Sequence, residues 1–261
     1  MKLLKLLIPS LLLCIQLQAQ DSTKAPVNPN ERSPFRKGYL RLGLSSLGNS
    51  LDNSLSPKDN ILNGNYGASQ GYIFETGHVY YFKPKSYRGL VNFGLDWTIL
   101  SATYNKLDQW ESYNNKGGEV YIDGASFSAS LASKLGPVVS FNPVEKLVID
   151  VRAQVAAVGR ITPFEYYEGE DGENPRSFSF YNYGEEDIDE GFDASSIKNV
   201  IAFGFGSNIG VTIRRKAIGL SVDYSSVNLK TNYDAWDGEV HTYGKEKIPT
   251  HSVQFKLSFT F

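Results

Sequence analysis

Charged residues recur along this 261-residue chain in stretches where apolar and polar residues alternate. Asp96 stands in VNFGLDWTIL and Lys256 in HSVQFKLSFTF, each on the polar side of its stretch. Successive side chains of a strand point to opposite faces, so these charges face away from the apolar side. Acids and bases gathered on one face can pair, whereas an unpaired buried charge is costly. The candidates are Arg41, Glu75, Asp96, Lys134, Asp150, Arg152, Asp223 and Lys256.

Eight alternating segments must position these charges. They are residues 38–47, 71–82, 89–104, 120–141 with a bend at Gly136-Pro137, 146–160, 199–214, 217–227 and 251–261. Each has about the length that crosses a bilayer at a tilt, roughly nine to eleven residues, or is longer. No stretch after residue 20 is long and apolar enough for a membrane helix, so a membrane span here requires a closed barrel.

The connections between these segments alternate in length. The long ones are residues 48–70, 105–119, 161–198 and 228–250, and the short ones are residues 83–88, 142–145 and 215–216. An even strand number, short periplasmic turns and long extracellular loops are typical of outer-membrane barrels. The sequence therefore predicts an all-β, antiparallel, up-and-down transmembrane barrel of eight strands over residues 38–261, with both termini in the periplasm.

Two other architectures share part of this pattern. A soluble sandwich or lipocalin-like barrel also has alternating strands. Here the face opposite the large apolar residues carries Gly, Ser, Asn and other short polar residues, which indicates a crowded polar interior and an apolar exterior. Aromatic residues within 166–183 indicate a hairpin that extends above the membrane, and a ten-stranded barrel is the minor alternative.

The last strand carries a family resemblance. With its alternation, its Tyr- and Asn-rich loops and its terminal Phe, the chain resembles the small eight-stranded outer-membrane barrels of the OmpA transmembrane-domain and OmpX type, in the versions found in Bacteroidota. The resemblance implies insertion by the outer-membrane assembly machinery, which in this family recognises a C-terminal strand ending in Phe. It implies no single activity, because this fold has many functions. The implied assembly signal is Phe255, Leu257, Phe259 and Phe261.

The N-terminal segment MKLLKLLIPSLLLCIQLQAQ predicts a secretory signal peptide over residues 1–19, with cleavage after Ala19 and a flexible periplasmic leader over residues 20–37. Cys14 is the only cysteine, and Leu13 before it disfavours processing as a lipoprotein. The mature chain is then free of cysteine, which excludes disulfides, a cysteine nucleophile and zinc–thiolate sites. A formal net charge of −2 gives no reason to expect nucleic acid as a partner.

The charged set has two interpretations inside such a barrel. Asp223 and Lys256 lie at similar heights on neighbouring strands, and so do Asp96 and Lys134, so both pairs are expected to interact. A network of this kind either fills and fixes a narrow lumen or gates a small pore for ions or small solutes. We favour filling, because the interior of an eight-stranded barrel is about wide enough for side chains to fill.

The third long loop is strongly acidic and raises the question of a metal. Carboxylates that converge can bind a hard cation such as calcium. The spacing matches no twelve-residue calcium loop, and a charge run is usually a solvated surface. We expect no metal and no cofactor; the weak candidate ligands are Glu186, Asp187, Asp189, Glu190 and Asp193.

A lipid A-modifying barrel enzyme, the third functional alternative, needs a serine nucleophile, a histidine and an acid near the outer leaflet. The chain has His78, His241 and His251, and His251 adjoins Ser252. Adjacent strand residues point to opposite faces, which argues against joint action. We therefore expect no enzyme. We expect a structural or surface-binding role through long extracellular loops, in contact with outer-membrane lipid, lipopolysaccharide or a protein partner in a larger complex.

Overall fold

Antiparallel strands make up most of the described chain. The computed structural model describes residues 33–83, 89–113, 119–123, 126–144, 146–169, 176–180 and 201–261. All of the strands belong to one unit, Pro34–Phe261. The predicted signal peptide and residues 20–32 of the predicted leader lie outside the described residues.

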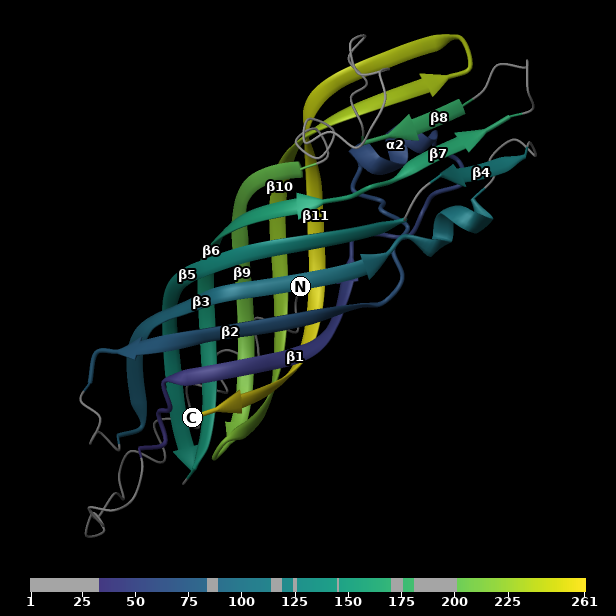
Figure 1. Cartoon of the computed structure of the whole chain (residues 1–261). Helices are drawn as coiled ribbons and strands as arrows, with labels where there is room; N and C mark the ends of the chain where they lie inside the picture. Colours follow the sequence, from purple (N-terminus) through teal and green to yellow (C-terminus); the bar gives the residue numbers. More distant parts are fainter. Residues whose placement is uncertain are drawn as a thin grey trace, which may run out of the picture. The chain divides into compact units, whose positions relative to one another are not determined.

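Eight of the described strands pair in an antiparallel ring that closes on itself (Figure 1). Around the ring these are β1 (Gly38–Leu47), β2 (Gly71–Tyr81), β3 (Val91–Lys106), β5 (Phe127–Val144), β6 (Leu147–Ile161), β9 (Ile201–Arg215), β10 (Ile218–Asp237) and β11 (Val240–Thr260). β11 pairs with both β10 and β1, so neither terminal strand is left as an edge. The predicted eight-stranded barrel is confirmed, and the ten-stranded alternative is wrong for the described residues.

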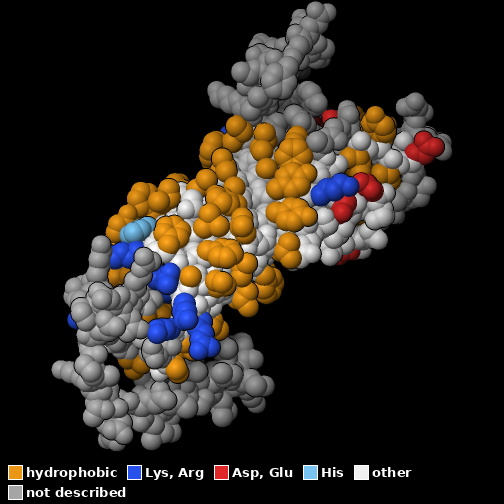
Figure 2. All heavy atoms as spheres, turned by 60° about the horizontal axis from the view of Figure 1, so that its bottom comes forward, with side chains coloured by type: hydrophobic (Ala, Val, Ile, Leu, Met, Phe, Trp, Pro, Cys, Tyr) orange, Lys and Arg blue, Asp and Glu red, His pale blue; other side chains and the backbone are white. Residues whose placement is uncertain are grey.

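The wall of this barrel is apolar outside and polar inside. On β10, Leu220 and Val222 are 68% and 46% exposed, whereas Ser221 and Asp223 between them are buried. Figure 2 shows the result, a broad belt of hydrophobic side chains on the barrel surface. A belt of this kind is stable against lipid and not against water, so the fold is a transmembrane barrel.

No helix among the described residues is long and apolar enough to span a membrane.

The two ends of the barrel differ. At one end, here the turn end, neighbouring strands are joined closely, as at Lys216 between β9 and β10. At the other, the hairpin end, β10 and β11 run on together to a turn at Gly238. Beside this hairpin lie β8 (Arg176–Ser179), β7 (Glu165–Glu168) and β4 (Val120–Asp123), which extend the sheet from β10 in that order (Figure 1). A short helix, α2 (Pro57–Leu62), and a 3-10 turn, η1 (Asp108–Ser112), lie among the same connections.

These pieces form a folded loop platform, by which we mean α2, η1, β4, β7, β8 and the β10–β11 hairpin beyond Val227. Trp110 lies at its centre, fully buried, and its indole N–H donates to the Tyr66 carbonyl at 2.9 Å. The Tyr166 hydroxyl donates to Glu168; burial, reinforced by this carboxylate, raises the pKa of Tyr166 well above its usual range. The buried apolar cluster consists of Leu47, Ile61, Tyr66, Leu107, Trp110, Tyr113, Phe164, Tyr166, Phe178, Phe180, Tyr233, Ala235 and Ile248.

Two predicted boundaries are wrong, both at the hairpin end. The predicted strand 120–141 is divided, because Val120–Asp123 pairs with β7 in the platform and only β5 belongs to the ring. The predicted long loop 228–250 is instead the hairpin that continues β10 and β11. Alternation shows that a segment is a strand but not which strand it pairs with, and the polar outer face of the hairpin made it resemble a loop. The hairpin predicted from the aromatic residues of 166–183 is present as β7 and β8.

A β-bulge in β3 keeps its polar residues facing the lumen and its apolar residues facing outward on both sides of the bulge. Ile99 and Leu100 are consecutive and both exposed, at 50% and 38%, and the pairing with β2 shifts between Thr76 and Gly77. The extra residue returns Ser101 to the lumen, where strict alternation would have placed Leu100. β2 has polar residues on both of its faces without a bulge. Glu75 points into the lumen, whereas His78 lies on the outer face, where its ring centroid is 4.7 Å from that of Tyr80.

Gly43→Ala tests the seam between β1 and β11. A Cβ at position 43 would overlap the carbonyl oxygen of Phe255, so we expect strain of roughly 1–3 kcal/mol and fewer closed barrels. The measurement is the fraction that migrates as folded, heat-modifiable protein, together with the urea midpoint. Gly244→Ala is the matched control, because its Cβ would meet Tyr233 no closer than 3.5 Å. Equal stability of the two variants would contradict this account of the seam.

Candidate functional site

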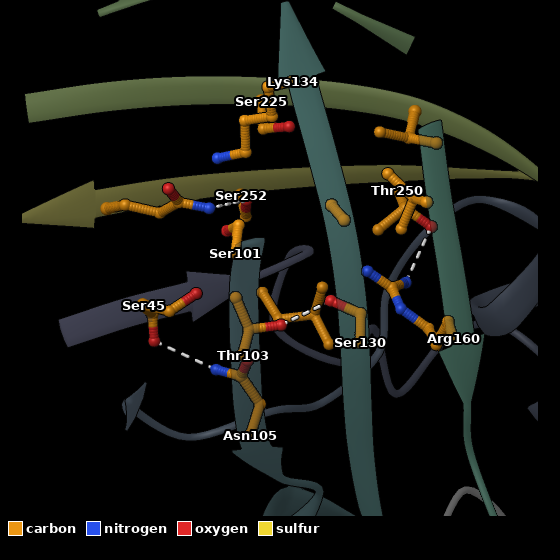
Figure 3. Close-up of a pocket in the computed structure, with 15 residues that line it drawn as sticks. Ser45, Ser101, Thr103, Asn105, Ser130, Lys134, Arg160, Ser225, Thr250 and Ser252 are labelled. Carbon is orange, nitrogen blue, oxygen red and sulfur yellow. Dashed lines mark hydrogen bonds between the residues drawn. The ribbon is translucent and has the colours of Figure 1, made fainter. Parts of the chain in front are cut away.

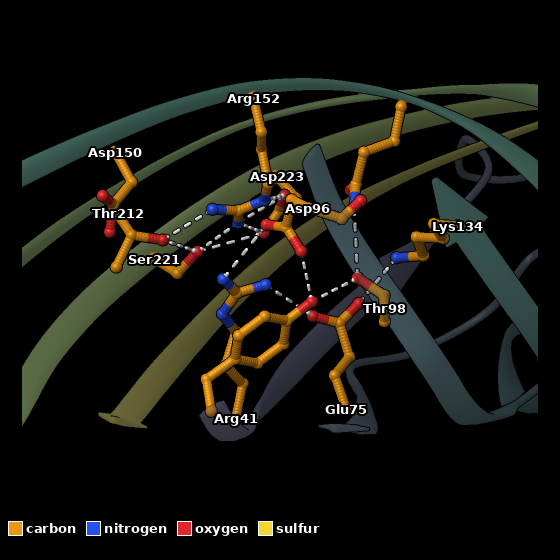
Figure 4. Close-up of polar contacts among 12 residues, drawn as sticks. Arg41, Glu75, Asp96, Thr98, Lys134, Asp150, Arg152, Thr212, Ser221 and Asp223 are labelled. Carbon is orange, nitrogen blue, oxygen red and sulfur yellow. Dashed lines mark hydrogen bonds and ion pairs between the residues drawn. The ribbon is translucent and has the colours of Figure 1, made fainter. Parts of the chain in front are cut away.

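The middle of the lumen holds a network of ion pairs (Figure 4). Glu75 on β2 accepts hydrogen bonds from Lys134 Nζ at 2.6 Å and from Lys256 Nζ at 2.7 Å. Lys256 Nζ also lies 2.5 Å from a carboxylate oxygen of Asp223. Asp223 in turn pairs with Arg152 at 2.6 Å. Four strands besides β2 thus contribute to one continuous network, and the predicted Asp223–Lys256 contact is present.

Arg152 is the most extensively hydrogen-bonded of these side chains. Besides Asp223, its guanidinium donates to Thr212 Oγ1 and to Ser221 Oγ, each at 2.6 Å. Gly210 on β9 leaves room for this arrangement, because a Cβ there would overlap the Asp223 carboxylate. Charge-assisted hydrogen bonds of this kind are the strong ones, and they orient both partners.

Arg41 connects this network to Asp96. Its guanidinium lies 3.7 Å from the centroid of the Tyr39 ring, and its Nη2 is 3.7 Å from Asp96. The Tyr39 hydroxyl donates to Asp96 at 2.6 Å, and Arg41 Nη1 is 3.6 Å from Glu75. Arg41 therefore lies between two acids and is stacked on an aromatic ring.

The predicted contact between Asp96 and Lys134 is wrong. The pairing of β3 with β5 places Gly136 opposite Asp96 and Thr98 opposite Lys134. Lys134 therefore lies two residues nearer the hairpin end, where its ammonium reaches Glu75. The strand order was predicted correctly, but the vertical offset between β3 and β5 could not be read from segment ends.

A second charged pair lies nearer the turn end. Asp150 accepts hydrogen bonds from Arg214 Nε at 2.9 Å and from Ser140 at 2.5 Å. Arg214 also donates to the carbonyl of Pro34 at 2.8 Å, which ties the start of the unit to the barrel. Sequence reasoning missed Arg214, although it shares the inward phase of Thr212 and stands at the end of a predicted strand.

A polar cavity lies between the ion-pair network and the loop platform (Figure 3). Its volume is about 30 Å³, and hydroxyl groups from several strands line it. Arg160 on β6 faces it and was also missed, although it shares the inward phase of Arg152. With the charges below this cavity and the apolar cluster above it, side chains fill the lumen at two levels. This arrangement favours filling over a pore.

Two residues considered for catalysis face opposite sides of the wall. His251 lies outside, where its Nδ1 is 3.0 Å from the Tyr224 hydroxyl and the two rings stack. Ser252 lines the internal cavity, and Gln254 donates to its hydroxyl. His241 is on the platform beside Asp234, 2.7 Å away, and His78 is on the outer wall. His251 and Ser252 are therefore not placed to act together as a base and a nucleophile.

The described residues contain no group of three or more His, Cys, Asp or Glu side chains placed to hold a metal. The acidic run at residues 186–193 lies outside the described residues.

The predicted assembly residues Phe255, Leu257, Phe259 and Phe261 point away from the lumen, and Phe261 exchanges backbone hydrogen bonds with Gly38 at 3.0 and 3.2 Å. Their recognition by assembly machinery stays a prediction.

No protein-family model and no curated protein sequence matches this chain. Solved structures similar to it include the outer membrane enzyme PagL, at 10% identity and a TM-score of 0.39 over 85% of this chain and 99% of PagL. Neisserial surface protein A matches at 10% identity and a TM-score of 0.37, over 89% and 100% of the two chains. The outer membrane protease OmpT from Escherichia coli matches at 8% identity and a TM-score of 0.39, over 88% and 98%.

Lys256→Met tests whether the central network supports the fold. Glu75 and Asp223 would each lose a partner inside the lumen, and breaking a buried pair costs roughly 3–5 kcal/mol. We expect a value near the lower limit, because Lys134 and Arg152 still contact the two acids. The measurement is urea unfolding of the purified barrel in detergent. Lys245→Met, at an exposed platform position, is the control and should change stability by less than about 0.5 kcal/mol. Equal midpoints for the two variants would show that the network contributes little.

Proposed function

We propose that this protein is an outer-membrane barrel that anchors a rigid binding platform at the cell surface. The observation that carries the proposal is the buried cluster around Trp110, which packs residues of four connections at the hairpin end into one folded layer. Long loops that only joined strands would have no reason to bury such a core. The lumen below, filled by ion pairs, suits an anchor better than a channel.

A cluster of lysines on the hairpin supports lipopolysaccharide as one contact of the platform. Lys230 and Lys247 lie directly opposite each other on β10 and β11, with Lys245 one step further along the same exposed face. Like charges placed opposite each other destabilise a sheet, and none of the three forms an ion pair with a described residue. They follow the stacked Tyr224 and His251 along the hairpin, and the exposed Phe203 on β9 lies directly opposite Lys230, so the lysines are at the rim of the apolar belt. Phosphate groups of lipopolysaccharide at that level would offset their repulsion.

Exposed aromatic rings near the turn of the hairpin supply a second contact area. The His241 ring lies 5.4 Å from that of Trp236 and 5.9 Å from that of Tyr243. Trp236 and Tyr243 are 38% and 70% exposed. Aromatic side chains give a large contact area at low entropic cost, which suits a protein partner within a larger outer-membrane complex.

The distribution of charge supports a platform that faces outward. At the turn end, the charged side chains of the described residues outside the lumen are all basic: Arg36, Lys37, Lys83, Lys146, Arg215 and Lys216. Figure 2 shows basic side chains gathered at one end of the hydrophobic belt. Basic residues at a membrane surface are attracted to anionic phospholipid. The platform is richer in acids than in bases. Turns in the periplasm and a platform outside fit this arrangement.

We propose no catalytic role and no cofactor. The separation of His251 from Ser252 by the barrel wall supports the first of these.

Labelling of single cysteines tests the orientation. Glu239→Cys at the hairpin turn should react with a membrane-impermeant maleimide on intact cells, because the platform is outside. Arg215→Cys at the turn end is the matched control, and should react only after the outer membrane is permeabilised. The parent protein reports any labelling of Cys14 itself. Labelling of Arg215→Cys alone on intact cells would reverse the proposed orientation.

Replacing the three platform lysines tests the lipopolysaccharide contact. Each Lys near an anionic membrane surface contributes about 1 kcal/mol, so Lys230→Ser, Lys245→Ser and Lys247→Ser together should weaken binding of purified lipopolysaccharide roughly a hundredfold. The measurement is the lipopolysaccharide concentration that half-saturates the shift in unfolding temperature of the detergent-solubilised protein. Lys37→Ser, Arg215→Ser and Lys216→Ser form the control at the opposite end. An equal loss in both triple variants would show only a general charge effect.

A further inference from the structure

The polar side chains that line the cavity above the ion-pair network can all donate hydrogen bonds and include no acid, and the rest of the lining is apolar: Leu47, Ala132, Val158 and Val227. Its lining contains Lys134 and Arg160, the amides of Asn105 and Gln254, and hydroxyls that include those of Ser45 and Ser225. Figure 3 shows the Arg160 guanidinium directed toward the Thr250 hydroxyl, with Ser130 beside it. A buried cavity with this lining favours a ligand that accepts hydrogen bonds and carries negative charge.

Arg160 is the exception among the buried bases of the lumen. It is 8% exposed, and it forms no ion pair with any carboxylate in the described part of the chain. Its Nη1 donates to Thr250 Oγ1 at 3.0 Å, and its guanidinium carbon lies 5.5 Å from the Tyr66 ring centroid. Its Nε has no acceptor, and the Ser45 hydroxyl at the same cavity is also buried without a partner.

The whole lumen has the same imbalance. Among the described residues, the bases buried in the lumen are Arg41, Lys134, Arg152, Arg160, Arg214 and Lys256, and the acids are Glu75, Asp96, Asp150 and Asp223. Two positive charges are therefore in excess inside a wall that faces lipid. Water can solvate a guanidinium but cannot neutralise it, and a buried charge without compensation is strongly unfavourable.

We propose that this cavity binds a small monovalent inorganic anion, of the size of chloride or bromide, beside Arg160. The anion accepts hydrogen bonds from the guanidinium, including its free Nε, and from the hydroxyls around it. Lys134 adds positive potential from the floor of the cavity while remaining paired with Glu75. One such ion removes half of the excess charge of the lumen.

The volume limits which anions fit. A single water molecule occupies roughly 10–15 Å³ of cavity volume. The cavity of about 30 Å³ therefore accepts one halide ion, or two to three waters. An organic anion such as gluconate is too large. This difference separates specific binding from a general effect of ionic strength, and the inference stands whether or not the platform has the function proposed above.

Bromide provides a direct test. The wild-type protein is folded from urea into detergent with bromide as the only anion, so that the ion is present when the lumen closes. The folded protein is then crystallised, and X-ray diffraction is recorded at the bromine absorption edge. We expect an anomalous peak in the cavity within hydrogen-bonding distance of the Arg160 guanidinium. Density without anomalous signal there would assign the cavity to water and overturn the proposal. This test uses only the wild-type protein, so it does not depend on the folding of a variant.

Thermal unfolding in solution is the second arm. At equal ionic strength, the unfolding temperature of the wild type should be several degrees higher in sodium bromide or chloride than in sodium gluconate, because a ligand of the folded state stabilises it. Arg160→Met removes the charge while keeping an unbranched chain, and should abolish this difference. Arg215→Met, at the exposed turn end, should retain it. A halide response that is absent in the wild type, or unchanged in Arg160→Met, contradicts the proposal.

Discussion

A closed ring of eight strands leaves a lumen that side chains have to fill, and the rest of this structure follows from how the filling is done. The chain places charges there, so each must be compensated inside the wall. Bases outnumber acids, and the acids are therefore the shared centres: Glu75 contacts three bases and Asp223 contacts two. Loss of Glu75 would leave three bases with a poorer set of partners, whereas loss of Lys256 leaves both Glu75 and Asp223 with another base.

The network and the apolar cluster close the lumen in different ways, and the difference matters for function. Ion pairs between strands that are not neighbours, such as Lys134 on β5 with Glu75 on β2, hold strands that share no backbone hydrogen bonds at fixed distances. The cluster around Trp110 joins connections that the wall alone would leave independent. Because β10 and β11 pass without interruption from one level to the other, the platform is continuous with the barrel wall. For the proposed binding role, a surface built in this way has little conformational entropy left to lose.

Much of the barrel could be predicted from alternation, and the platform could not. A wall strand has one side in lipid and one in a polar lumen, so its period of two appears in the sequence; Gly38–Leu47 was predicted residue for residue. The platform buries an apolar face beneath an outer face of Lys, Asn and Asp, as on the extension of β10, and this pattern resembles a solvated loop. The same alternation also predicted which charged residues face the lumen. It did not predict their partners, because Lys134 reaches Glu75 through the offset between strands and the bulge at Ile99–Leu100.

The sign of the charge also changes along the barrel axis, from the turn end through the lumen to the platform. This order limits where an anion can bind. The turn end is basic, the lumen carries an excess of positive charge, and the platform is mainly acidic except for the lysines beside the apolar belt. An acidic surface is repelled by the phosphates of lipopolysaccharide, so the proposed contact with them is confined to the place where Lys230, Lys245 and Lys247 lie. Inside the wall, screening by salt is weak, and neither set of surface charges can compensate Arg160. Its compensation has to come from within the lumen, where every described acid already has a basic partner.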